Sequence, residues 1–146
     1  MAIIVNLKRA IQEIKLDDSP DSPVYTLDLT DSRIANNVKR FKGMLKELGG
    51  IKKALDALKK SDEIPLDLRK RIAACYKDII TETLGEKAYK EILEYVGGEN
   101  VKAEEVTTAL SPLIIYLTGE INEAVRGNNE GAFRKYLGEE YGAASM

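Results

Sequence analysis

From residue 34 onward, apolar side chains recur at spacings of three and four residues, with glycine or proline interrupting the pattern at intervals. This period is typical of amphipathic helices that pack on a core. The first stripe consists of Ile34, Val38, Phe41, Leu45 and Leu48. Gly49-Gly50 predicts the end of that helix, since glycine often follows a helix C-terminus. A short helix at 51–58 and longer ones at about 66–84, 86–96 and 100–126 are expected next, so the chain is predicted to be mainly helical.

The segment after Asn100 is the most apolar of these helices, and we expect it to be the central one. Pro112 interrupts it. A proline inside a helix loses one backbone hydrogen bond and crowds the preceding turn, whereas a proline at the first helical position is tolerated. Ser111-Pro112 therefore indicates either a kink or the start of a new helix.

The first 30 residues have a different period. Residues 3–7 and 11–16 are rich in apolar and β-branched side chains and predict one or two strands, and residues 24–29 predict another. Between them, residues 17–23 carry two prolines and several capping side chains, which is typical of a turn. We expect an antiparallel hairpin at about 9–30. Its face of Tyr25, Leu27 and Leu29 should pack on the stripe that contains Phe41.

The chain has 146 residues, about the length of one domain. The predicted fold class is α+β: a mainly α-helical single domain with an N-terminal antiparallel β-hairpin. The domain is expected to span 1–137, with the hairpin at about 9–30 and helices at about 31–137, the last a weak one at 130–137. Small and polar residues at 138–146 predict a flexible C-terminal tail.

The composition argues against catalysis and metal binding. The chain has no histidine, which is the commonest metal ligand and general base near neutral pH, and only one cysteine. Neither Gly49-Gly50 nor Gly97-Gly98 has the sequence of a phosphate-binding loop. Cys75 lies on an apolar stripe between Ile72 and Ile79, so we expect a buried structural thiol. We predict a protein that is not an enzyme and has no catalytic residues, cofactor or metal site.

Basic residues concentrate at 39–60. This basic stripe comprises Lys39, Arg40, Lys42, Lys46, Lys52, Lys53, Lys59 and Lys60. It is compatible with a solvated helix face, with a surface for an acidic protein partner, or with binding to a phosphate backbone. Nucleic acid is the least favoured of the three, because the stripe lacks interleaved aromatic residues and the pI is about 5.4. Lys39, Lys42 and Lys46 are candidate partner-binding residues.

The second set of candidate partner-binding residues lies in the helix after Asn100. They are Leu113, Ile114, Tyr116 and Leu117, and together with Ile115 they surround the helix with apolar or aromatic side chains. A helix that is apolar all round must be central or covered by a partner. We therefore expect the protein to self-associate and to bind an elongated helical partner.

The order of the segments resembles a known family. The resemblance depends on five segments in this order. They are a hairpin ending in Val24-Tyr25-Thr26-Leu27-Asp28-Leu29-Thr30-Asp31, a long amphipathic helix, the run Tyr76-Lys77-Asp78-Ile79-Ile80-Thr81-Glu82-Thr83-Leu84-Gly85-Glu86, the run Tyr89-Lys90-Glu91-Ile92-Leu93, and an apolar helix. Over most of residues 8–125 the chain is similar to the tail assembly chaperones of long-tailed bacteriophages and prophages of Gram-positive bacteria. Their genes lie just before that of the tape measure protein.

The resemblance implies a non-enzymatic phage tail assembly chaperone. Such a protein binds the tape measure protein, keeps it soluble and helps to recruit tail tube subunits. It implies action in the cytoplasm of the bacterial host and absence from the mature virion, while the short apolar runs predict no membrane partner. The alternative is a helical regulatory or nucleic-acid-associated adaptor that uses the basic stripe of residues 39–60.

Overall fold

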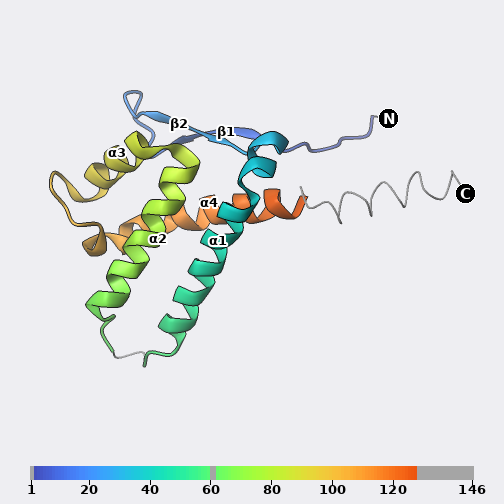
Figure 1. Cartoon of the computed structure of the whole chain (residues 1–146). Helices are drawn as coiled ribbons and strands as arrows, with labels where there is room; N and C mark the ends of the chain where they lie inside the picture. Colours follow the sequence, from blue (N-terminus) through green and yellow to red (C-terminus); the bar gives the residue numbers. More distant parts are fainter. Residues whose placement is uncertain (1, 60–61, 128–146) are drawn as a thin grey trace, which may run out of the picture.

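The computed structural model describes residues 2–59 and 62–127, and in this part of the chain a two-stranded hairpin precedes four α-helices (Figure 1). The elements are β1 (Ile11–Lys15), β2 (Val24–Asp28), α1 (Asp31–Asp56), α2 (Leu66–Leu84), α3 (Glu86–Gly97), a short 3-10 turn (Ala103–Glu105) and α4 (Thr107–Gly127). The predicted α+β class, mainly helical with an N-terminal antiparallel hairpin, is confirmed. The predicted helix at 130–137 and the tail at 138–146 lie outside the described residues.

The hairpin pairs β1 with β2 in the register Ile11 to Asp28 and Lys15 to Val24. Alternate side chains of β2 point into the core, so that Tyr25 and Leu27 are buried while their neighbours are exposed. Of the one or two strands predicted across residues 3–16, one forms, which is β1, and residues 3–7 form no second strand. That segment makes no strand pairing, and Figure 1 shows it running away from the body of the molecule.

The helices pack around α2. It contacts α1, α3, α4 and β2, whereas α4 contacts α2 and α1. Figure 1 shows α1 and α2 descending side by side from the hairpin end of the molecule, with α4 crossing them. The prediction that the helix after Asn100 would be central is therefore wrong. The central helix is α2 instead. It is less apolar overall than α4, but it has buried residues on more than one side, including Ile72, Ile79 and Ile80.

Gly49-Gly50 does not end a helix, because α1 runs without interruption to Asp56. Each glycine in a helix interior costs about 1 kcal/mol relative to alanine, and packing outweighs that cost when apolar residues follow. Here Ile51 is 2% exposed. A Cβ at position 50 would lie 2.9 Å from Nη2 of Arg71, which is the end of an exposed, flexible side chain, so the glycine leaves room for that guanidinium.

The predicted helix at 51–58 is thus the last part of α1, whereas the predicted ends of the helices at 66–84 and 86–96 are confirmed. Gly85 separates α2 from α3 with φ +103°, and Gly98 follows α3 with φ +80°, two values that favour glycine. Pro112 lies inside α4, so the alternative in which a new helix begins at Ser111-Pro112 is wrong. Ser111 instead donates its hydroxyl hydrogen bond to the carbonyl of Thr107, one turn earlier in the same helix.

One apolar cluster joins the hairpin to all four helices. The expected partners Tyr25, Leu27, Leu29 and Phe41 all belong to it, and Phe41 is 1% exposed. The helix that has the most extensive contact with β2 is α2, however, so the hairpin rests on α2 at least as much as on α1.

No helix among the described residues is long and apolar enough to cross a bilayer.

Candidate partner-binding site

The largely apolar groove between α1 and α2 is the main candidate site. It is a cavity of about 340 Å³, and its lining is mostly aliphatic: Leu45, Leu48, Gly49, Ile51, Lys52 and Leu55 from α1, with Ile72 and Tyr76 from α2. We call it the α1–α2 groove. A groove of this composition suits an apolar side-chain row, such as one face of a helix.

The groove exists because α1 carries more apolar positions than its neighbours cover. Ile34, Phe41, Met44 and Ile51 form an inner strip that is buried. Val38, Leu45, Leu48 and Leu55 form an outer strip, which is only partly buried. The outer strip follows the inner one by four residues at every position, so the two strips are adjacent rows on one helix.

The position of Gly49 adds to the opening. It lines the groove beside the outer strip, and a Cβ placed there would meet no atom within 4 Å. The helix therefore leaves open space at a point where a larger side chain would fill it. Gly49, which does not end α1, thus contributes to the shape of the groove.

The candidate lysines run along one flank of the groove. Lys39, Lys42, Lys46 and Lys53 follow one another at spacings of three, four and seven residues, which places them on one strip of α1 next to Leu45 and Gly49. All four are exposed. Within residues 2–59 and 62–127, none of them forms an ion pair.

Ion pairs between α1 and α2 lie on the opposite flank. Arg40 pairs with Glu82 at 2.8 Å, and Arg71 pairs with Glu47 at 2.5 Å. Arg33 also donates to the carbonyl of Glu82. The helix pair is thus joined by charge on one side, and its other side presents cations without partners in the described chain. That asymmetry favours an acidic partner along the groove.

The α4 candidates separate into two groups. Ile114 is 2% exposed and Leu117 is fully buried, so their prediction as partner-binding residues is wrong: both belong to the core. Tyr116 is 42% exposed, and its hydroxyl donates to Oε1 of Gln12 on β1. Ile115 is an apolar residue of α4 that does face outward, since it is 72% exposed. It was not among the predicted partner-binding residues.

Leu113 is partly buried and lines a second hollow. This cavity of about 310 Å³ lies between the end of β1, α3 and α4, and its lining includes Ile14, Leu16, Tyr95, Val96 and Pro112. Tyr95 at its rim donates a hydrogen bond of 2.8 Å to Asp17 in the hairpin turn. The pKa of Asp17 is lowered, first by the backbone N–H of Ser19 and then by this phenol.

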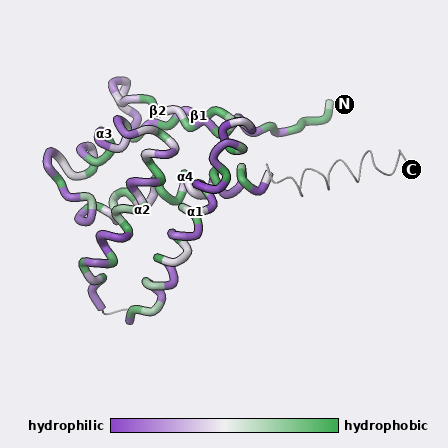
Figure 2. Tube along the Cα trace, in the orientation of Figure 1, coloured by the Kyte–Doolittle hydropathy of each residue, from purple (hydrophilic) through white to green (hydrophobic). Residues whose placement is uncertain are grey.

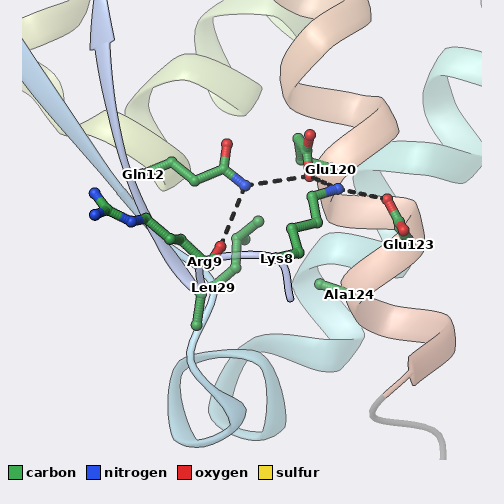
Figure 3. A pocket seen from close by; sticks show the side chains of 8 residues that line it. Lys8, Arg9, Gln12, Leu29, Glu120, Glu123 and Ala124 are labelled. Carbon is green, nitrogen blue, oxygen red and sulfur yellow. Dashed lines mark hydrogen bonds and ion pairs between the residues drawn. The ribbon is translucent and has the colours of Figure 1, made fainter. Parts of the chain in front are cut away.

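The hairpin is fixed to α3 and α4 by polar contacts. Tyr25 donates to Glu91 on α3 at 2.9 Å, and burial followed by this carboxylate raises the Tyr25 pKa to about 12. On the other side, Figure 3 shows Lys8 reaching between Glu120 and Glu123 of α4. Its pKa is raised by those two carboxylates. These contacts define a small hollow of about 150 Å³ beside Leu29 and Ala124.

Reactive chemistry has little support in these side chains. Cys75 is 4% exposed, as predicted, and burial raises its pKa to about 11, so the thiol is protonated near neutral pH. Among the residues that the structure describes, no cluster of three or more cysteine and carboxylate side chains could hold a metal ion. The expectation that the chain is not an enzyme stays a prediction.

Sequence reasoning selected the lysines but not the groove beside them. The signal was present as two sets of apolar residues with the same spacing of seven, three and seven, offset by four, which is wider than one covered stripe requires.

No family model matches the chain, and the comparisons with curated proteins and with solved structures found no match either.

Proposed function

We propose that this chain is a non-enzymatic binding protein whose α1–α2 groove holds the apolar face of a helix from another protein. The observation that carries the proposal is the combination of an aliphatic groove with a row of lysines along one flank that form no ion pair with another described residue. Helix-in-groove recognition uses apolar anchors spaced by three or four residues, and the outer strip offers a complementary row.

The charges select the partner. A helix seated in the groove would place one of its flanks against Lys42 and Lys46, so glutamate or aspartate on that flank is favoured. Exposed charge pairs at a rim contribute little each, commonly about 0.2–1 kcal/mol, but they set orientation and discriminate against basic helices. The preferred ligand is therefore an amphipathic helix with an acidic flank.

Together with the family resemblance, this supports a role as a phage tail assembly chaperone. In this proposal the helical ligand is a segment of the tape measure protein, which the chain keeps soluble while tail tube subunits are recruited. The protein then acts in the cytoplasm of the bacterial host and is absent from the mature virion. Repeated weak contacts along a long helical rod would add up through avidity without one tight site.

The charge part of the proposal is tested with two synthetic helical peptides. Both carry a leucine face, and one has glutamate and the other lysine along the same flank. The intact protein should bind the glutamate peptide more tightly, and the Lys42→Glu/Lys46→Glu variant should weaken that binding by roughly tenfold. Lys90→Glu/Lys102→Glu is the matched control, since it makes the same charge change at exposed positions outside the groove. Equal binding of both peptides by all three proteins would contradict the proposal.

Co-expression tests the biological partner. If the gene lies before one that encodes a very long helical protein, that protein should be more soluble when both are produced together. The groove-filling variant Gly49→Leu should reduce this effect, because the side chain would occupy space that is now open. An unchanged yield of soluble rod protein with either form would argue against the chaperone role.

The basic stripe supports a second candidate, a nucleic-acid-associated adaptor. Four exposed lysines in one row on α1 can neutralise phosphates, and such binding weakens steeply as salt increases. A duplex-DNA shift assay at moderate salt separates the two proposals. Retardation that Lys42→Glu/Lys46→Glu abolishes, in a protein that binds neither peptide, would favour the adaptor.

A further inference from the structure

Residues 2–7 form an extended arm with an unusual surface. The large apolar side chains in it are almost fully accessible, with exposures of 90% for Ile3, 85% for Ile4, 71% for Val5 and 88% for Leu7. Figure 2 shows apolar residues along this segment, away from the core. An apolar, β-branched and extended segment is a ready strand when a sheet edge is available.

The hairpin of the same chain provides such an edge. Leu29 donates a backbone hydrogen bond of 2.8 Å to Ala10, and alternation along the antiparallel ladder then turns the N–H and C=O groups of Val24 and Thr26 away from β1. No backbone or side-chain partner for these groups occurs in the described chain. One edge of β2 is thus unpaired within residues 2–59 and 62–127.

A hollow lies along that edge. It measures about 440 Å³ and runs between β2 and the start of α3, with Val24, Tyr25, Thr26, Leu84, Ala88 and Glu91 among its lining residues. Val24 is 51% exposed beside it. The edge therefore has both free backbone groups and space for side chains from an added strand.

The arm and the free edge of β2 lie on opposite sides of the hairpin within one chain. Lys8, directly after the arm, is held by Glu120 and Glu123 on α4, on the β1 side of the hairpin (Figure 3). The free edge of β2 lies on the opposite side, over α3, where Tyr25 binds Glu91. The arm would have to reverse direction and cross the hairpin, whereas a second molecule can present its own arm directly.

We propose that the arm of one molecule adds as a third strand to the free edge of β2 in a second copy of this chain. The arm residues 3–7 match the five-residue length of β2. Antiparallel addition brings Arg9 toward the hairpin turn of the acceptor, which carries Asp17, Asp18 and Asp21. The Arg9 guanidinium points away from α4 in Figure 3 and has no side-chain partner among the described residues, so it is available for that turn.

This interface goes beyond the proposed function, because it uses neither the α1–α2 groove nor the lysines beside it. Peptide binding in the groove and association through the arm can therefore succeed or fail separately. The two surfaces lie on different elements, α1 and α2 for the groove and the arm and β2 for the self-association.

Sedimentation of the full chain over a concentration series is the first test. The intact protein should associate, and a polar-arm variant, Ile3→Ser/Val5→Ser/Leu7→Ser, should weaken self-association by about tenfold or more. Asn6→Ser is the control, since it changes a polar arm residue and leaves the apolar ones intact. A protein that stays monomeric up to about 1 mM, or a polar-arm variant that associates like the intact chain, would overturn the proposal.

Mixing two defective variants tests the pairing of arm with edge. Thr26→Pro removes an outward N–H from β2 and should abolish the acceptor edge, whereas Thr26→Val keeps it. At a concentration where the intact protein associates but the weakened variants do not, the polar-arm variant and Thr26→Pro should together form a one-to-one complex, because one supplies the edge and the other the arm. Absence of that complex between folded variants would refute the pairing.

A further mixture guards against misfolding of Thr26→Pro, which circular dichroism would reveal. The polar-arm variant retains its edge, so it should still be captured by the intact protein although it does not associate with itself. If it is not captured, the edge of β2 is not the acceptor and the proposal fails.

Discussion

The inner and outer apolar strips of α1 have the same spacing, but they differ in burial. Ile34, Phe41, Met44 and Ile51 are buried, and the residues four positions later, Val38, Leu45, Leu48 and Leu55, are only partly covered. Both strips are equally apolar in sequence. The difference comes from the neighbours, because α2 and α4 pack over the first strip and leave part of the second facing the α1–α2 groove. Periodicity therefore reveals how wide an apolar face is, but not which of its edges stays open.

The largest contrast should appear at the inner strip. Phe41→Ala removes a side chain that is 1% exposed, and we expect it to lower the free energy of unfolding by about 3–5 kcal/mol, since truncation leaves a cavity as well as losing apolar burial. Urea unfolding followed by circular dichroism measures this. Phe41→Leu, which keeps most of the volume, should cost clearly less, and a midpoint unchanged by Phe41→Ala would show that the inner strip is not a core element.

The outer strip should respond more weakly. Leu45→Ala is expected to lower the free energy of unfolding by about 1–2 kcal/mol, because this side chain is already partly in contact with water. The same variant should reduce binding of the glutamate peptide, since Leu45 lines the groove. A loss of stability as large as that of Phe41→Ala would mean that the groove is closed in solution and would remove the distinction between the strips.

The smallest effect concerns Cys75, which belongs to the same core cluster as the inner strip. Its pKa is raised from 9.0 to about 11 by burial, so above pH 9 the unfolded chain loses this proton while the folded chain keeps it. The free energy of unfolding should therefore fall by about 1 kcal/mol between pH 9 and 10.

That window lies below the pH at which the buried Tyr25 phenol, with its pKa of about 12 against 10.0 in an exposed tyrosine, adds a similar slope. Cys75→Ala should flatten the decline between pH 9 and 10 in denaturant titrations. An equal slope in both proteins would show that the thiol is not desolvated in the folded state.

The sequence predicted the fold class because strand and helix periods differ and glycine marks helix ends. It failed where tertiary packing outweighed a local signal. Gly97-Gly98 and Gly49-Gly50 look alike as doublets, yet Gly98 takes a positive φ after α3 whereas Ile51 buries itself against the core and carries α1 onward. Only the packing on the far side of each doublet distinguishes them.

Only part of the candidate site could be predicted from the sequence: the exposed lysines could, and the groove beside them could not. The lysines are exposed as expected, because charged side chains stay in water unless they are paired. Ile114 and Leu117 were predicted to bind a partner because apolar side chains surround α4. They are buried, because α1 and α2 already cover that side of the helix. A groove needs two helices at a particular separation, and one helix's sequence does not contain the position of the other.

The contacts that fix the hairpin also determine when it can dock. Lys8 and Gln12 reach Glu120 and Glu123, more than 100 positions later in the chain, and Tyr25 reaches Glu91. At ribosomal rates of about 5–20 residues per second, roughly 5–20 seconds pass between synthesis of β2 and synthesis of the middle of α4. During that interval Lys8 and Gln12 lack their partners on α4. The polar contacts of residues 8–12 with α4 therefore join a segment that is made early to one that is made late.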